Sequence, residues 1–476
     1  MNNLSTLTIS KVVGRIKSGN LSSVELVAYH IDLAKTRGKE LNAFITVIDS
    51  ALDRAKQIDS DIAAGKDTGK LAGIPFTVKD VIMTKGVQTT ASSRMLEGFI
   101  APYTATVIER LEAEGAINIG KTNSDPFAFG ASGENSGFGP TKNPIDETRV
   151  PGGSSSGAAA SLAAGIGLFA IGTDTGGSVR QPASFCGLVG FKPTYGRNSR
   201  YGLIAMASSF DTAGILTRNV RDTALVESVM AGKDSRDATS YDVPVPDYTA
   251  ELDRRVDLEG VKIGVPNEYF GEGLSVEVRE KVEEAIAKYS QAGAKILKID
   301  LPILESVLPI YYVLVPSEIS SNMARYDGVR YGRKLSDDYL ENIFATRGKF
   351  MEDEVKRRVM IGTYTLSAGY AEEYYKTALK VRVKLTREID KVFDSVDVIM
   401  GPTSPVTAFK LGEKNDDPLQ MYLVDIYTVT ANLVGVPAIS INCGTDKDGL
   451  PVGLQLMTKR FNESQLFALA AAYEKL

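Results

Sequence analysis

Short apolar runs alternate with helical segments from Leu71 onward, and this alternation constrains the fold more than any other feature of the sequence. Strands are expected at 76–79, 116–119, 168–172, 188–191, 261–265, 295–299, 396–400, 438–442 and 452–456. Helices are expected at 104–114, after a Gly/Ser loop within 154–165, and near 275–292. This pattern is typical of an α/β fold in which helices cover a large sheet.

Three regions depart from the alternation. Residues 1–70 are predicted to be helical, and Ser22-x-x-Glu25 is a capping-box signature at the start of one helix. Residues 318–391 are mostly helical and rich in tyrosine, so we expect them to form a cap over one side of the sheet. The polar, Asp-rich stretch 231–252 is the best candidate for a surface linker.

The composition is that of a soluble globular protein, with 43% hydrophobic and 24% charged residues. A net charge of −5 argues against autonomous, high-affinity binding of nucleic acid, which requires basic surfaces. Cys186 and Cys443 form no CxxC pair, so no zinc or redox motif is predicted, and such cysteine usage fits a reducing cytoplasm. The first residues show no signal-peptide pattern, and the run 158–172 is too short to span a membrane.

The chain contains a single histidine, His30, in the first helical region. This count excludes a serine hydrolase with a downstream histidine base and a metal site built from several histidines. It also removes the nucleophile-elbow interpretation of 153–157, which matches GxSxG around Ser155. The stretch 115–122 matches the P-loop pattern, but its middle is strand-like and follows a helix, so we do not expect nucleotide binding there.

Three segments within 71–230 carry residues that packing does not readily explain. The apolar strand in 73–80 ends in Lys79. The loop 150–157 places two glycines before Ser154 and leads into an Ala-rich helix. The loop 172–182, GTDTGGSVRQP, places Ser178 near the start of another helix. Taken singly, these segments also fit a solvated lysine, a flexible linker and a helix cap.

Together the segments indicate a serine nucleophile activated by a lysine. A neutral lysine can replace histidine as the base, as it does in Ser–Lys enzymes. A free lysine has a pKa of about 10.4, so holding its pKa near 7 costs ~4 kcal/mol. Burial in a dry site shifts the pKa of lysine by that much. Successive backbone N–H groups beside two glycines suit an oxyanion hole.

The region 152–203, which contains GGSSSGAAAS and GTDTGGSVRQPASFCGLVGFKPTYGRNSRYGL, resembles the amidase signature family. The resemblance implies a single large mixed β-sheet covered by helices on both faces, with 71–230 as the catalytic core. Carried over to this chain, Ser178 is the nucleophile, Ser154 the bridging serine after a cis peptide bond, and Lys79 the base. The oxyanion N–H groups come, together with that of the nucleophile, from Thr175, Gly176 and Gly177.

The chain departs from the family pattern at Ser156, where its relatives usually carry glycine. A backbone angle that only glycine tolerates at this position would disturb the loop of the bridging serine. We nevertheless expect activity to survive the change.

A resemblance over nearly the whole chain narrows the family to the A subunits of tRNA-dependent amidotransferases. It is carried by LAGIPFTVKD, GKTNSDPFAFG, SEISSNMARYDGVRYG, GTYTLSAGY and PVGLQL. It implies one domain over 1–476 that releases ammonia from glutamine in the cytoplasm. A partner B subunit then binds ATP and Mg, contacts the tRNA, and uses the ammonia on Glu-tRNA(Gln) or, in some complexes, Asp-tRNA(Asn). A small C subunit clamps the two, and this chain itself needs no cofactor, metal or membrane.

Free glutamine requires a carboxylate for its α-ammonium and an arginine for its α-carboxylate. The resemblance assigns these roles to Asp425 and Arg358, with Tyr311 nearby. Because two other basic residues precede Arg358 directly, a solvated helix face remains an alternative for it. The basic run 380–387 either contacts RNA or forms a solvated helix face, and the acidic residues just beyond it favour the second.

Two further functions remain open on the sequence alone. The first is a stand-alone amidase that hydrolyses another small amide by the same chemistry, and good turnover of apolar amides without partners would favour it. The second is an inactive scaffold, against which the intact lysine and both serines argue. Rapid acylation of Ser178 that is lost in Lys79→Ala would remove the scaffold hypothesis.

Overall fold

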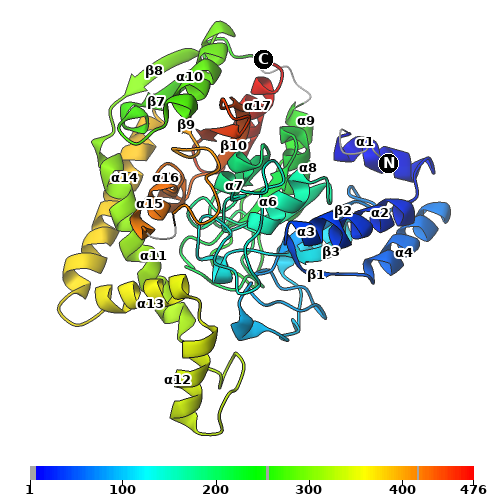
Figure 1. Cartoon of the computed structure of the whole chain (residues 1–476). Helices are drawn as coiled ribbons and strands as arrows, with labels where there is room; N and C mark the ends of the chain where they lie inside the picture. Colours follow the sequence, from blue (N-terminus) through cyan, green and yellow to red (C-terminus); the bar gives the residue numbers. More distant parts are fainter. Residues whose placement is uncertain (1–6, 253–256, 415–416) are drawn as a thin grey trace.

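An eleven-stranded mixed sheet runs through the computed structural model of the chain, which describes residues 7–252, 257–414 and 417–476 (Figure 1). In spatial order the strands are β1 (Phe44–Val47), β3 (Ile117–Thr122), β2 (Pro75–Lys79), β4 (Phe169–Thr173), β6 (Ala213–Thr217), β5 (Val189–Lys192), β10 (Ala438–Thr445), β11 (Pro451–Met457), β9 (Val398–Pro402), β7 (Lys262–Pro266) and β8 (Lys295–Ile299). All nine predicted strands belong to this sheet, so the predicted α/β fold is confirmed.

Strand direction within the sheet brings two distant loops together. β2 pairs in parallel with both β3 and β4, with Val78 opposite Ile171. The carboxyl ends of parallel neighbours lie at the same edge of a sheet, so Lys79 at the end of β2 lies close to the loop that follows β4. The middle strands, from β4 through β6, β5, β10 and β11 to β9, pair antiparallel.

Helices surround the sheet (Figure 1). Their bounds are α1 (Ile9–Lys17), α2 (Ser23–Lys35), α3 (Arg37–Glu40), α4 (Ala51–Ala63), α5 (Thr106–Ala113), α6 (Ser156–Ala163), α7 (Arg180–Phe185), α8 (Val220–Met230), α9 (Tyr248–Leu252), α10 (Val276–Gln291), α11 (Val307–Met323), α12 (Tyr339–Phe350), α13 (Asp353–Thr365), α14 (Lys376–Val392), α15 (Pro418–Leu423), α16 (Val429–Val434) and α17 (Glu463–Tyr473). As the capping box predicts, the Ser22 hydroxyl accepts hydrogen bonds from the N–H groups of Val24 and Glu25 at the start of α2.

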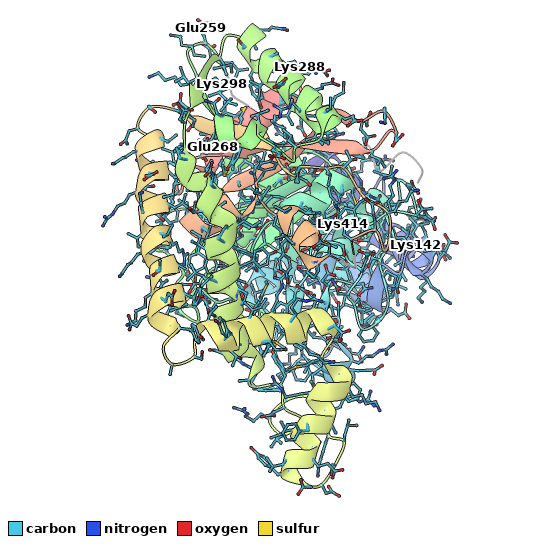
Figure 2. All side chains as sticks on the ribbon, turned by 60° about the vertical axis from the view of Figure 1, so that its left-hand side comes forward. Lys142, Glu259, Glu268, Lys288, Lys298 and Lys414 are labelled. Carbon is cyan, nitrogen blue, oxygen red and sulfur yellow. The ribbon has the colours of Figure 1, made fainter. Side chains whose placement is uncertain are left out.

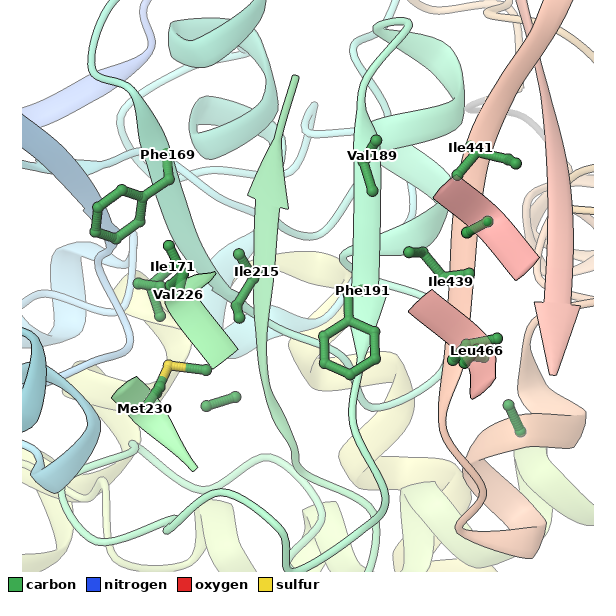
Figure 3. Packing of buried hydrophobic residues seen from close by; sticks show 14 of the residues in the cluster. Phe169, Ile171, Val189, Phe191, Ile215, Val226, Met230, Ile439, Ile441 and Leu466 are labelled. Atoms are coloured by element: carbon green, nitrogen blue, oxygen red, sulfur yellow. The ribbon is translucent and has the colours of Figure 1, made fainter. Parts of the chain in front are cut away.

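The central strands bury one face against two helices (Figure 3). β4 contributes Phe169 and Ile171, while α8 contributes Met230 and α17 contributes Leu466. The Phe169 ring also stacks on Phe76 of β2, with ring centroids 4.8 Å apart. This packing fixes β2 and β4 relative to each other, and therefore fixes the two segments that carry the candidate catalytic residues.

Two strands lie where none was predicted. β1 falls inside 1–70, so the prediction of a purely helical N-terminal region was wrong. It is a four-residue edge strand that pairs antiparallel with β3, and so short a run gives little periodicity to detect. β6, with the sequence AGILT, was also missed, although it is fully buried between β4 and β5.

The stretch 231–252 is a held surface segment rather than a free linker. Asp237 accepts hydrogen bonds from the backbone and guanidinium of Arg200, and its side chain is 3% exposed. Asp234 binds the hydroxyls of Thr106 and Ser199, and the stretch ends in α9 with Tyr248 buried. Hydrogen bonds through carboxylates, which composition does not reveal, tie the segment to the core.

A helical region follows β8 and includes α11 to α14 (Figure 1). Its first part, Pro302–Met323, is long and apolar enough to cross a membrane by length and composition, with a mean hydropathy of 1.2. However, 56% of its apolar window is buried inside the protein, where it packs against α13, α14 and α16. Burial inside the protein accounts for its composition, as in the core helix of a large domain.

Candidate active site

Lys79 is fully buried at the end of β2 and faces two hydroxyls. Its Nζ donates to Ser154 Oγ at 2.7 Å and to Thr173 Oγ1 at 3.0 Å. Burial lowers the pKa of Lys79 to about 7, against the opposing effect of Asp125, Asp174 and Asp211. This is the value that a lysine base needs at neutral pH.

Ser154 lies in the loop between Val150 and α6, and the peptide bond between Gly153 and Ser154 is cis. The N–H of Asp125 donates to the Ser154 carbonyl at 3.2 Å, which ties the loop to the segment after β3. Gly152 adopts φ +83°, and a Cβ there would lie 2.5 Å from Gln181 Oε1. Gly152 therefore supplies a positive φ that other residues rarely adopt, and both glycines before Ser154 lie where a side chain would collide with a neighbour.

Ser178 lies between β4 and α7, beside the loop of Ser154. The N–H of Ser155 donates to the Ser178 carbonyl at 3.1 Å, so the two serine loops are joined backbone to backbone. Ser178 is 9% exposed, whereas Lys79 and Ser154 are 0% exposed. Of the three predicted catalytic residues, Ser178 is therefore the one that a substrate can reach.

Backbone N–H groups gather at the turn before Ser178. Within the described residues, the N–H groups of Thr175, Gly176 and Ser178 have no hydrogen-bond partner. Gly177 differs from the prediction, because its N–H donates to Asp174 Oδ1 at 3.0 Å. The turn thus offers three free donors, and the fourth holds its shape.

Both glycines of this turn are required by close neighbours. A Cβ on Gly176 would lie 2.2 Å from Tyr311 Oη, and a Cβ on Gly177 would lie 2.2 Å from Thr428 Oγ1. Gly177 also adopts φ +127°, which disfavours other residues. Thr428 Oγ1 in turn donates to the Gly176 carbonyl at 2.6 Å. The turn is therefore packed tightly against α11 and the start of α16.

A buried ion pair under the turn was not predicted from the sequence. Arg180 Nη2 lies 2.9 Å from Asp174 Oδ1, and both side chains are fully buried. Burial alone would raise the pKa of Asp174, but the Arg180 guanidinium lowers it to about 2. Asn432 and Gln455 complete the hydrogen bonds of the pair. The aspartate and arginine of DTGGSVR signal a charged pair, but only the fold shows that they meet.

Arg358 points into the protein, which decides between its two sequence interpretations. It is 3% exposed, and its Nε donates to Glu354 Oε1 at 2.7 Å. Its guanidinium carbon lies 5.4 Å from the ring centroid of Tyr312 and 5.5 Å from that of Tyr422. Arg358 therefore lies beside the stacked rings of Tyr312 and Tyr422, whose centroids are 4.1 Å apart, and does not belong to a solvated helix face.

Asp425 lies near Arg358, and Tyr311 lies beside Gly176 in the turn before Ser178. The hydroxyl of Tyr312, the neighbour of Tyr311 on α11, donates to Asp425 Oδ2 at 3.3 Å. Burial raises the pKa of Asp425 to about 7, although the nearby Arg358 opposes the rise. An arginine, a carboxylate and two phenols are thus brought together, and one of the phenols, Tyr311, lies beside Gly176.

Ser156 does not disturb the loop of the bridging serine. It is the first residue of α6 and has no positive φ, so no backbone angle there requires glycine. Its hydroxyl contacts Thr141 Oγ1 at 3.3 Å, and its Cβ lies where a side chain on Gly133 would collide. The glycine that this contact requires is therefore Gly133, and the side chain of Ser156 occupies the space beside it.

In the P-loop match and the nucleophile-elbow match, the key residues make contacts within the fold. Lys121, in the P-loop match, is buried in β3 and pairs with Asp80 at 3.0 Å. Ser155 donates to the Thr173 carbonyl at 3.3 Å. His30 accepts a hydrogen bond from the N–H of Gly167, and burial lowers its pKa to about 3, so it stays neutral.

The basic run 380–387 lies on α14, where Lys380, Lys384 and Arg387 are exposed. Arg382 instead turns inward, donates to the Leu433 carbonyl at 2.8 Å and lies over the Phe210 ring. Within the described parts of the chain, no group of three or more His, Cys, Asp or Glu side chains is arranged to hold a metal ion.

Comparison with known proteins places this site in a family. The amidase family model matches residues 25–467. The chain is 50% identical to the A subunit of glutamyl-tRNA(Gln) amidotransferase from Heliobacterium modesticaldum, over 96% of this chain and 93% of that protein. It is 53% identical to the corresponding protein of Koribacter versatilis, over 91% of each chain.

Solved structures give the same result. The crystal structure of the A subunit of glutamyl-tRNA(Gln) amidotransferase from Thermotoga maritima superimposes with a TM-score of 0.83 and 40% identity, over 99% of this chain and 95% of that one. The peptide amidase of Stenotrophomonas maltophilia superimposes with a TM-score of 0.81 and 30% identity, over 98% and 96% of the two chains. The chain therefore belongs to the amidase family, together with the amidotransferase A subunits that it resembles over nearly its whole length.

Proposed function

We propose that this chain is the glutamine-hydrolysing subunit of a glutamyl-tRNA(Gln) amidotransferase. The observation that carries the proposal is the juxtaposition of Lys79 and two serine loops with Arg358 and Asp425. The lysine and the serines suit hydrolysis of an amide, and the charged pair suits the α-carboxylate and α-ammonium of free glutamine. The relatives that match over nearly the whole chain are named as the A subunit of glutamyl-tRNA(Gln) amidotransferase, which supports the proposal.

In the proposed mechanism, neutral Lys79 takes the proton of Ser154 while Ser154 takes the proton of Ser178. The Ser178 Oγ attacks the side-chain carbonyl of glutamine and forms a tetrahedral intermediate. The free N–H groups of Thr175, Gly176 and Ser178 stabilise its oxyanion. The C–N bond then breaks, the relay returns a proton to the leaving nitrogen, and ammonia departs. Water, activated by the same relay, hydrolyses the γ-glutamyl ester on Ser178 and releases glutamate.

Recognition of glutamine falls to three side chains beside the oxyanion turn. Asp425 accepts the α-ammonium, and the raised pKa of its carboxyl reflects burial that this cation would compensate. Arg358 binds the α-carboxylate, while Glu354 and the two tyrosine rings fix its direction. Tyr311 Oη lies next to Gly176, so it bounds the space between the amino-acid group and the reacting amide.

The ammonia would be used by a partner B subunit, held to this chain by a small C subunit in a cytoplasmic heterotrimer. ATP, Mg and most of the tRNA contact are expected on the B subunit, and the acceptor is Glu-tRNA(Gln) or Asp-tRNA(Asn). The relatives are named as one subunit of an amidotransferase, which supports a division of the reaction between chains.

The test is a comparison of amide substrates with and without partners. Release of ammonia is measured from glutamine and from an apolar primary amide, first with the isolated chain and then with B and C subunits and misacylated tRNA. The proposal predicts turnover of glutamine that rises with the partners and tRNA, and none in Ser178→Ala. Good turnover of the apolar amide that is unaffected by partners would instead identify a stand-alone amidase.

A further inference from the structure

The polarity of α12 is the reverse of that expected for a surface helix. Its buried side chains are Asn342, Thr346 and Phe350, so two of the three positions facing the protein are polar. Tyr339, Leu340 and Phe344 face solvent and are 62%, 62% and 76% exposed. A helix of a globular protein normally buries its apolar stripe and exposes its polar one.

Hydrogen bonds fix α12 in this orientation. Asn342 Oδ1 accepts from the N–H of Leu335 at 2.7 Å, and Asn342 Nδ2 donates to the Gly328 carbonyl at 3.0 Å. Thr346 Oγ1 donates to the Arg333 carbonyl at 2.8 Å. The preceding loop is thus bound to the inner face by polar contacts. Turning the helix to bury its apolar side would break these buried hydrogen bonds.

Exposed apolar side chains are concentrated around this helix. Of the 22 large hydrophobic residues that are exposed in the described parts of the chain, six lie in the 16 residues from 329 to 344. They are Val329, Tyr331, Leu335, Tyr339, Leu340 and Phe344. The helix also projects from the body of the molecule (Figures 1 and 2). An apolar concentration of this kind marks an interaction site.

We propose that the α12 surface, defined as Tyr339, Leu340 and Phe344, docks into an apolar groove on a partner subunit of the amidotransferase. The proposal rests on the proposed function for the existence of that partner, and it adds where the partner binds. Leu340 and Phe344 are four residues apart and lie one above the other on the helix, as anchors do when a helix enters a groove.

The charges beside the surface favour a protein over a lipid membrane. Asp337, Asp338 and Glu341 lie directly beside Tyr339 and Leu340 in the sequence, and Asp337 is fully exposed. Exposed Lys334 pairs with Asp337, and Arg330 pairs with Asp327, so charges of both signs flank the surface, whereas a helix that lies on an anionic membrane typically has a uniformly basic polar face. A protein partner can offer basic side chains at the rim of its groove.

The shape and size favour a different chain over a second copy of this one. The three side chains expose on the order of 400 Å², whereas a stable interface buries about 800 Å² on each partner. If this projecting helix packed against the same helix of a second copy, the interface would bury little area beyond these three side chains. A groove that encloses α12 also covers its flanks, and therefore reaches the area that stable association requires.

The test uses the full chain with its B and C subunits and the variants Leu340→Glu and Phe344→Glu. Affinity for the partners is measured by calorimetry or by interferometry at equal ionic strength. Each variant should weaken association at least about 30-fold, because each places a charge at an apolar anchor. Val276→Glu is the matched control, since Val276 is 64% exposed on α10, and it should bind as the wild type does.

Acylation of Ser178 in each isolated variant should match the wild type, which shows that the fold and the catalytic site are intact. Unchanged partner affinity in both α12 variants would overturn the docking proposal and leave the proposed function standing. A wild-type chain that binds neither the B nor the C protein would instead overturn the proposed function. Binding of the wild type to vesicles of phosphatidylcholine and phosphatidylglycerol, or a dimer of the isolated chain, that Phe344→Glu abolishes would also overturn the proposal, because a membrane or a second copy would then be the occupant.

Discussion

Replacement of Lys79 by methionine should stabilise the protein while it abolishes activity. The side chain of Lys79 is completely buried, and burial holds its pKa at about 7, against an ordinary value of 10.5. The folded protein therefore binds a proton at this position less readily than the unfolded chain does. Methionine is similar in length and carries no charge, so it removes this penalty from the folded state.

The magnitude of the effect depends on pH in a defined direction. At pH 6 the lysine is protonated in both states, and the difference between the two pKa values corresponds to a penalty of about 5 kcal/mol. At pH 9 the folded state is neutral while the unfolded state is still protonated, and the penalty falls to about 2 kcal/mol. The penalty is thus complete below pH 7 and disappears as the pH rises towards 10.5. Loss of the two hydrogen bonds of Nζ costs ~1 kcal/mol each at any pH, so it changes the offset but not this dependence.

The assay is urea unfolding of the wild type, Lys79→Met and Lys298→Met at several values between pH 6 and pH 9. Lys298 is exposed on β8 and serves as the control (Figure 2). The stability gained in Lys79→Met should be about 3 kcal/mol larger at pH 6 than at pH 9, and Lys298→Met should show no such trend. A constant difference between Lys79→Met and the wild type over this range would refute a neutral buried lysine, and with it the proposed base.

Four further results are expected from the same geometry. Asp425→Asn should raise KM for glutamine at least about 30-fold with little change in kcat, and steady-state kinetics that show the opposite split would remove Asp425 from the binding site. Because the pKa of Asp425 is about 7 and its carboxylate binds the α-ammonium, KM in the wild type should fall as pH rises from 6 to 8, and this trend should be absent from Asp425→Asn. Gly176→Ala should lower kcat at least about 100-fold because its Cβ would lie 2.2 Å from Tyr311 Oη, with partial recovery in the double variant with Tyr311→Phe, and an active single variant would contradict the tight turn. Ser156→Gly should keep kcat/KM within about twofold but unfold more easily, by ~0.5–1 kcal/mol, since glycine at the start of α6 gains freedom only in the unfolded chain, and a large change in activity would restore the doubt about this position.

Strands and helices with strong periodicity could be predicted from the sequence, because local pattern decides them. The predicted strand 295–299 coincides with β8, and the predicted helix near 275–292 contains α10. Periodicity failed for β1, a four-residue edge strand, and for β6, whose neighbours β4 and β5 supply its context. Pairing partners distant in the sequence stabilise both strands, and a local window does not contain them.

In the candidate site, too, some features could be inferred from the sequence, whereas others appear only in the folded structure. A lysine base could be inferred because the single histidine left few bases for a serine, whereas the separate roles of Ser154 and Ser178 came only from the resemblance to the amidase signature family. The partners of these groups could not, since Thr173 meets Lys79 only through the parallel pairing of β2 and β4. Likewise the sequence left two orientations open for Arg358, and the aromatic rings that hold it come from α11 and α15.

Glutamine should form an ester with Ser178 through a relay that depends on Lys79. Mass spectrometry of the peptide that carries Ser178 detects this ester, after the protein is mixed with glutamine and quenched in acid at successive times. We expect a transient γ-glutamyl group on Ser178 in the wild type, and slow or absent labelling in Lys79→Ala at pH 7. A γ-glutamyl group on another residue, or equal labelling rates in the wild type and Lys79→Ala, would contradict it.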